Sequence, residues 1–125
     1  MIVGLGIDLV DTSRIARDLS RERWRTAHGI FTAAEIRHCS AGMQPERLYA
    51  ACFAAKEATL KALGADVADL GIFREVEVRG GPGGECAIRL RKRLLAIARR
   101  SGTRSINLSV AVRKKNVVAM VILES

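Results

Sequence analysis

The chain has 125 residues, 49% of them hydrophobic, and a formal net charge of +8 at pH 7. This length and composition exclude a disordered chain and fit one domain over residues 1–125. The excess of basic residues predicts an anionic partner, such as an acidic protein, a phosphorylated ligand, a membrane surface or a nucleic acid.

The first predicted element is a strand over residues 2–10 whose apolar run is interrupted. Gly4, Gly6 and Asp8 fall inside it, and glycine inside a strand indicates that another backbone or a site lies close by. The run ends at Asp8 after too few residues to cross a bilayer, and neither a basic segment nor a cleavage site marks it as a signal peptide. We therefore expect a cytoplasmic protein with no membrane partner.

A helix with a basic face is predicted directly after this strand. Asp11 offers an N-cap, and apolar residues then recur at helical spacing around Ile15. Arginines decorate this helix and the segment after it: Arg14, Arg17, Arg21, Arg23 and Arg25. Such a run is usually a solvated face, and the alternative is a patch that binds an acidic partner.

Two further helices are predicted in the first half of the chain. Thr32 and Glu35 fit a capping box at the start of a short helix over 33–39. Pro45 suits the first turn of a longer helix over 46–63.

The second half of the chain predicts strands around one basic helix. Alternating apolar and polar residues predict strands over 72–79, Cys86–Leu90, 106–112 and 117–123. Residues 80–84 and 113–116 are turn sequences that join these strands into two hairpins, and Lys92–Arg100 forms a helix between the hairpins. This order predicts an α+β fold in which a long helix packs on an antiparallel sheet.

The long helix closes at Gly64 and carries Glu57 at the centre of its apolar stripe. A carboxylate there must be paired, hydrogen-bonded or bound to a cation, because leaving it bare is costly. One possibility is an i, i+4 ion pair with Lys61. The other involves Asp8, because the two acids, brought together by packing the helix on the first strand, would form the hard-oxygen site that Mg²⁺ occupies with phosphate oxygens and water. Lys61 could then neutralise a phosphate in the same cleft.

The chain contains two motifs whose order and separation match those of a known family. The first reads GIDLVD at 6–11 with Arg14 downstream, and the second reads FAAKEA at 53–58 with Lys61 and Gly64 downstream. Together they resemble the signature motifs of the holo-acyl-carrier-protein synthases, the small 4'-phosphopantetheinyl transferases. The resemblance covers almost the whole chain in element order and is concentrated in the first half.

The resemblance implies an enzyme that moves the 4'-phosphopantetheine arm of coenzyme A onto a serine of an acyl carrier protein, a step that primes fatty acid or polyketide assembly. It implies that Asp8 and Glu57 hold Mg²⁺ against the coenzyme A diphosphate, with Lys61 beside the same phosphates. Gly64 and Ser109 would contribute to coenzyme binding. Arg14 would contact the acidic carrier protein.

The resemblance also implies a 4'-phosphopantetheinyl transferase-like fold and a homotrimer with the coenzyme pocket at the subunit interface. The base that takes the serine proton stays open between Glu57, a metal-bound water and Glu35. Glu35 has the competing role of capping partner for Thr32.

Several positions depart from the pattern of this family. Similar enzymes carry Gly-Lys-Pro near the second strand, Ser-x-Ser-His before the last turn, an arginine in the second motif and an aromatic residue after the turn. In this chain, Glu85 and Cys86 stand in place of Lys-Pro, and Ala111 and Val112 stand in place of Ser-His. Cys52 stands in place of the arginine, and Asn116 stands in place of the aromatic residue. Each change removes a donor or a cation from the expected nucleotide pocket, at a typical cost of about 1.5 to 3 kcal/mol.

Three hypotheses follow for the function. The first is an active transferase in which the basic helix over 91–100, or Lys114 and Lys115, supplies the missing cations. The second is a weak or inactive relative that acts as a carrier-binding or scaffold module. The third is a basic nucleic-acid binder, which we rank last because only 4% of the residues are aromatic and the two acids stay unexplained. Retention of Asp8 and Glu57 favours the first hypothesis.

Overall fold

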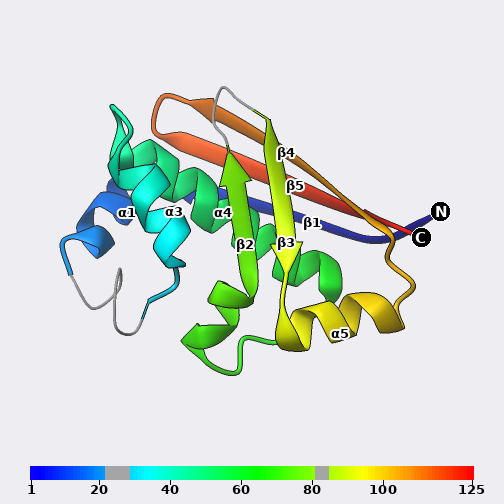
Figure 1. Ribbon diagram of the computed structural model, residues 1–125. Helices are drawn as coiled ribbons and strands as arrows, with labels where there is room; N and C mark the ends of the chain where they lie inside the picture. Colours follow the sequence, from blue (N-terminus) through cyan, green and yellow to red (C-terminus); the bar gives the residue numbers. More distant parts are fainter. Residues whose placement is uncertain (22–28, 81–84) are drawn as a thin grey trace.

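The computed structural model describes residues 1–21, 29–80 and 85–125 (Figure 1). Its helices are α1 (Thr12–Leu19), α3 (Ala33–Ser40), α4 (Pro45–Leu63), α5 (Lys92–Arg100) and a 3-10 helix, η1 (Leu70–Glu75). Its strands are β1 (Ile2–Asp11), β2 (Val76–Gly80), β3 (Cys86–Leu90), β4 (Ser105–Arg113) and β5 (Asn116–Glu124). The predicted α+β class is confirmed.

The long helix α4 lies between two antiparallel sheets (Figure 1). It packs on β1 and β5 of the three-stranded sheet, whose order is β1-β5-β4, and on its other side it contacts β2 of the β2-β3 hairpin. Alternation on β5 builds the core beneath the helix, because Val117, Ala119, Val121 and Leu123 are buried and the residues between them face away.

Two glycines of β1 allow α4 to approach this sheet closely. A Cβ on Gly6 would lie under 3.0 Å from the Ala58 carbonyl oxygen and the Ala62 nitrogen, and a Cβ on Gly4 would meet the Ala62 carbonyl oxygen. The glycines inside the strand therefore mark a close backbone approach, as the sequence indicated.

Local signals fixed the helix ends. The capping box at α3 is present: the Thr32 nitrogen donates to Glu35 Oε1 at 2.8 Å, and the Glu35 nitrogen donates to Thr32 Oγ1 at 3.2 Å. At the C-terminal end of α4, Gly64 adopts the left-handed conformation with φ of 64°. Both predictions are confirmed.

The strand predicted over 72–79 is wrong in its first half. Ile72 and Phe73 are buried side by side, which does not match the period of a strand, and they lie in η1. The alternating pattern and β2 both begin at Val76. The sheet also divides in two, since β2 and β3 pair only with each other.

The last hairpin has a shorter turn than predicted, because Arg113 and Asn116 pair with each other and leave only Lys114 and Lys115 between the strands. Most of the turn predicted over 80–84, and two arginines of the basic run, Arg23 and Arg25, lie outside the described residues. Within the described ranges, the helices are too short or too polar to cross a membrane.

Candidate active site

Asp8 is held on the inner face of β1 by the pleat of the strand. It shares this face with Gly4 and Gly6, and its partner on β5 is the buried Ala119. Because the glycines bring α4 onto this face, the Asp8 side chain, only 11% exposed, lies against the helix.

Glu57 of α4 meets Asp8 at this contact. Burial raises the pKa of Glu57 to about 7, and the charge of Asp8 and a hydrogen-bonding contact between the two carboxyl groups act in the same direction. The charges of Lys61 and Arg14 oppose this shift without cancelling it. The structure thus brings together two acids that are 49 positions apart in the chain.

The contact between the two acids leaves an acceptor without a donor. Asp8 Oδ2 is buried and receives no hydrogen bond from the described part of the chain. An ionised carboxylate only accepts hydrogen bonds, so the contact with Glu57 is a hydrogen bond only when the pair holds a proton. When both acids are ionised, a cation is needed between them.

Lys61 binds Asp8 rather than its helical neighbour Glu57. Its Nζ donates to Asp8 Oδ1 at 2.9 Å and to the Ile7 carbonyl oxygen at 3.1 Å, and the hydrogen bond to Asp8 raises the Lys61 pKa. The i, i+4 ion pair with Glu57 is therefore replaced by a contact from helix to strand. One lysine beside two acids leaves the group with net negative charge when both are ionised.

Arg14 and Gly64 border this group from two sides. Arg14 is exposed on the first turn of α1, and its charge lowers the Glu57 pKa, so it lies on the same side of the molecule. Gly64 is exposed directly after the last turn of α4, and no atom lies within 4 Å of the position that its Cβ would take. A ligand can approach the backbone there.

Ser109 lies on the other face of the three-stranded sheet. It pairs with Met120 of β5, which in turn pairs with Ile7, and all three side chains are exposed. Asp8 follows Ile7 and points inward, because neighbouring residues of a strand face opposite sides. Within one chain, Ser109 is therefore separated from the two acids by the sheet.

Glu35 is fully engaged in the core with a residue that the sequence analysis overlooked, Lys56. The Lys56 Nζ lies 2.7 Å from Glu35 Oε1 and donates to the carbonyl oxygens of Phe73 and Val76 at 2.7 and 2.6 Å. Glu35 Oε2 accepts from the Val78 nitrogen at 2.7 Å. Both side chains are buried, so Glu35 is a structural acid.

A signal for Lys56 was present in the sequence. Lys56 lies three and four positions from Phe53 and Leu60, on the apolar stripe of α4. The argument that a carboxylate in this setting needs a partner applies to an ammonium group equally. On α4, we applied this argument only to the adjacent Glu57.

Comparisons with known proteins identify the family of the chain. Residues 4–119 match the profile of the family described as the 4'-phosphopantetheinyl transferase superfamily.

The chain belongs to this superfamily.

Its relatives are holo-[acyl-carrier-protein] synthases. The sequence is 38% identical over 124 residues to the holo-[acyl-carrier-protein] synthase of Koribacter versatilis, covering 99% of both chains. The fold is similar to the crystal structure of the Neisseria meningitidis synthase, with a TM-score of 0.83, 29% identity and complete coverage of both chains. It is also similar to the structure of the Chronobacterium ammoniagenes synthase in complex with coenzyme A. The TM-score is 0.80 and the identity 27%, and the match covers 97% of this chain and 96% of that chain.

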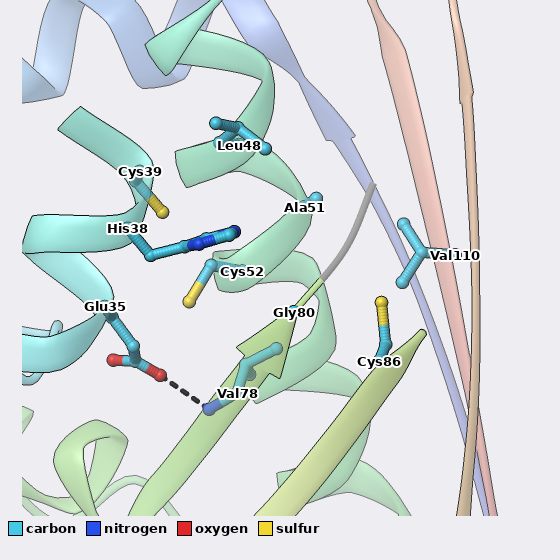
Figure 2. A pocket seen from close by; sticks show the side chains of 10 residues that line it. All are labelled: Glu35, His38, Cys39, Leu48, Ala51, Cys52, Val78, Gly80, Cys86 and Val110. Atoms are coloured by element: carbon cyan, nitrogen blue, oxygen red, sulfur yellow. Dashed lines mark hydrogen bonds between the residues drawn. The ribbon is translucent and has the colours of Figure 1, made fainter. Parts of the chain in front are cut away.

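Some positions at which this member of the superfamily departs from the expected pattern gather around one small cavity. Figure 2 shows Cys52 of α4, Cys86 of β3 and Val110 of β4 on its walls. The cavity measures about 20 Å³, room for a single water. Burial raises the pKa of the Cys52 thiol well above its usual range, so the thiol is neutral there. Where the family pattern has an arginine and a proline, this chain has two cysteines that line a small, mostly apolar pocket.

The first turn of α5 is occupied by ion pairs. Arg91 lies 3.2 Å from Glu77 Oε1, and Arg93 contacts both Glu75 and Asp69. These two arginines hold α5 against η1 and β2. Their charge is already balanced by acids of the same chain.

Proposed function

We propose that the protein transfers the 4'-phosphopantetheine arm of coenzyme A to a serine of an acyl carrier protein, with Mg²⁺ bound by Asp8 and Glu57. The observation that carries this proposal is the contact between these two acids beside Lys61, inside a fold similar to holo-[acyl-carrier-protein] synthases. The proposal treats residues 1–125 as one domain.

The residues fit a magnesium ion that shares its shell with a substrate. Asp8 Oδ2 is a buried acceptor without a donor, and Glu57 carries an oxygen ligand beside it. In the described ranges no three His, Cys, Asp or Glu side chains gather as a metal cluster. Two carboxylates are what Mg²⁺ uses when phosphates and water complete its octahedron. When bound, the ion would neutralise charge on the coenzyme A diphosphate.

Residues of the chain then divide the remaining tasks. Lys61, half exposed beside Asp8, would place a positive charge on the same diphosphate. The exposed Gly64 backbone would let the coenzyme pass the end of α4. In the reaction, the serine oxygen forms a bond to the phosphorus of the arm, the diphosphate P–O bond breaks, and adenosine 3',5'-bisphosphate leaves with the bridging oxygen.

The serine proton needs an acceptor at this site. The Glu35 carboxylate does not fit this role, because it is buried and already has three contacts, with the Thr32 nitrogen, the Val78 nitrogen and Lys56. Glu57 or a water beside it therefore takes the proton. On the carrier side, the exposed Arg14 would contact an acidic surface of the carrier protein.

We also propose that the chain assembles as a homotrimer, which would complete the coenzyme pocket. The outer face of the three-stranded sheet exposes the large apolar side chains Leu5, Ile7, Leu9, Val118 and Met120. Ser109 lies on this face and cannot reach Asp8 of its own chain. A neighbouring copy packed on this face would use Ser109 at the coenzyme of another subunit.

The test is a transfer assay with the intact protein. Wild type with coenzyme A, Mg²⁺ and apo acyl carrier protein should give the mass gain of the attached arm, and Glu57→Ala should lower the rate about 100-fold or more. Asp66→Ala, an exposed acid just beyond α4, is the matched control and should retain the rate. Full activity of Glu57→Ala contradicts the metal assignment. Absence of transfer by wild type that still binds the carrier supports the inactive module instead.

A further inference from the structure

A broad groove separates the first turns of α1 and α4 from the turn between β4 and β5. Its volume is about 490 Å³. It is lined by Thr12, Ser13, Ala16, Gln44, Glu46, Arg47, Lys114 and Lys115. In Figure 1 the three elements meet at one end of the long helix, far from η1 and α5.

Two hydrogen bonds to carbonyl oxygens of the turn hold the walls of the groove together. The Thr12 nitrogen donates to the Lys115 carbonyl oxygen at 2.8 Å, and Arg47 Nη2 donates to the Lys114 carbonyl oxygen at 3.1 Å. Both bonds use the main chain of the turn, so they do not occupy the two ammonium groups. The groove is therefore formed before any ligand arrives.

The lining carries three cations and one acid. Lys114 and Lys115 are exposed, and within the described ranges neither ammonium group has an acid within 4.0 Å. The acid, Glu46, lies in the first turn of α4, where the helix dipole favours it. A hydrogen bond from the Ser13 nitrogen lowers the pKa of Asp11, and the charge of Lys115 acts in the same direction. Neither lysine, however, forms an ion pair within the described ranges, so both ammonium groups can act on a partner.

The groove continues the surface that Arg14 begins. Thr12 and Ser13 line it and directly precede Arg14, whose charge reaches Glu57 on the site side of α1. A protein docked over the first turn of α1 would therefore cover both Arg14 and the groove. Coenzyme A bound at the acids would not need to extend around this helix.

We propose that this groove is a second docking site for the acyl carrier protein, in which Arg47, Lys114 and Lys115 receive acidic side chains of the carrier. The inference rests on the proposed function, because that function supplies the acidic partner. It assigns the two lysines to the carrier rather than to the coenzyme.

The experiment compares two double charge reversals. Lys114→Glu/Lys115→Glu alters the groove, and Arg74→Glu/Arg89→Glu alters exposed sites on η1 and β3. Each lowers the formal net charge by four, from +8 to +4, because each exchange replaces a positive charge with a negative one. For all proteins we would measure KM for apo carrier and for coenzyme A, and the affinity for fluorescently labelled apo carrier without coenzyme A.

The groove variant should weaken carrier binding roughly tenfold and raise the carrier KM by a similar factor, with kcat and the coenzyme A KM within about twofold of wild type. The matched control should change carrier affinity by less than about twofold. Glu46→Gln, which removes the acid, should tighten carrier binding about twofold. These effects should shrink as salt is added.

Three results overturn the inference: unchanged carrier affinity in the groove variant, equal loss in the control pair, or a rise in the coenzyme A KM instead of the carrier KM. If wild type binds the carrier without transferring the arm, the affinity measurement alone decides. Loss of carrier binding by the groove variant would then support the groove while the enzymatic proposal fails. Absence of carrier binding by wild type overturns the groove proposal.

Discussion

At the scale of single residues, Lys56 is a fully buried cation of the core. Its ammonium group is buried and is bound by Glu35 Oε1 and by the carbonyl oxygens of Phe73 and Val76. It joins α4 to α3, η1 and β2 at one point. Burying an ion is favourable only when its partners remain in place.

Lys56→Met should destabilise the protein by about 3 to 5 kcal/mol, because it leaves the Glu35 carboxylate buried without its cation. This is a large share of the roughly 5 to 15 kcal/mol that stabilises a typical domain. The measurement is the free energy of unfolding in urea. Adding Glu35→Gln should recover part of the loss, and strict additivity of the two changes would contradict the coupling. Lys61→Met, at the half-exposed lysine, is the control and should cost much less.

The pair of Asp8 and Glu57 makes metal-free stability depend on pH. The pKa of Glu57 is about 7 in the folded protein against 4.5 for the free group, chiefly through burial. The folded state therefore binds this proton more tightly than the unfolded state, and stability falls as pH rises from about 4.5 through 7.

Glu57→Gln should remove this loss, because a neutral amide has no charge to repel Asp8 and can donate to its Oδ2. The gain over wild type at pH 8 should be on the order of 1 kcal/mol after allowing for partial exposure, and near zero at pH 4. Unfolding in chelator at both pH values measures it. Added Mg²⁺ at pH 8 should stabilise wild type more than the variant, and an identical response of both proteins would count against the metal site.

At the scale of elements, the contact of β1 with α4 sets the distance between the two acids. Gly6→Ala should place a methyl group against the Ala58 carbonyl oxygen, which belongs to helix backbone and can move only if α4 itself shifts. We expect a destabilisation of about 1 to 3 kcal/mol, together with loss of transfer because α4 shifts away from Asp8. Unfolding in urea and the transfer assay check the two effects.

Gly71→Ala is the matched control for this change. Its Cβ would meet the Asp69 side chain at 3.0 Å and lie 4.0 Å from Arg74 Nη2, and both of these exposed side chains can move. Its stability and activity should remain close to wild type. Equal effects of the two alanines would show that the close approach of β1 and α4 is not what Gly6 provides.

Most elements could be predicted because their signals are local. Thr32 with Glu35 and the terminal Gly64 defined helix ends by hydrogen bonds and φ angles that depend on a few neighbours. The start of β2 was predicted too early because Ile72 and Phe73 are apolar residues of types common in strands. Only their burial side by side, seen in the structure, separates them from the alternating pattern of the strand. Burial depends on the tertiary fold, which pattern alone does not contain.

The contact of Asp8 with Glu57 could be anticipated for a physical reason. Each is an acid inside an apolar element, and a buried carboxylate needs a hydrogen-bond donor or a cation, which the two acids can share. The partner of Lys61 could not be anticipated from the sequence. Glu57 lies one helical turn away and Asp8 lies on the neighbouring strand, and only the packed structure shows that Lys61 forms its ion pair with Asp8.

At the scale of the whole molecule, the described chain buries one face of the three-stranded sheet and leaves the other bare. Under the inner face lies α4, and the outer face carries Leu5, Ile7 and Met120 with no element over them among the described residues. The position of Ser109 on this bare face could not be derived from sequence, since a strand pattern shows alternation but not which face is inner. In the proposed homotrimer, the same face would link assembly to the coenzyme pocket.

Leu5→Lys should therefore separate the proposed homotrimer into monomers, because it places a charge at the centre of the apolar face. Leu5 is 56% exposed in the single chain, so the folded monomer should keep its helix content by circular dichroism. Light scattering after size exclusion measures the mass. Val67→Lys is the control: Val67 is 53% exposed in the segment after α4, outside the strands of the sheet, and should leave the mass unchanged. The Leu5→Lys monomer should also lose affinity for coenzyme A, because in the proposed homotrimer Ser109 would reach the acids only across a subunit contact. A wild-type protein that is monomeric and still binds coenzyme A would show that the bare face does not build the pocket.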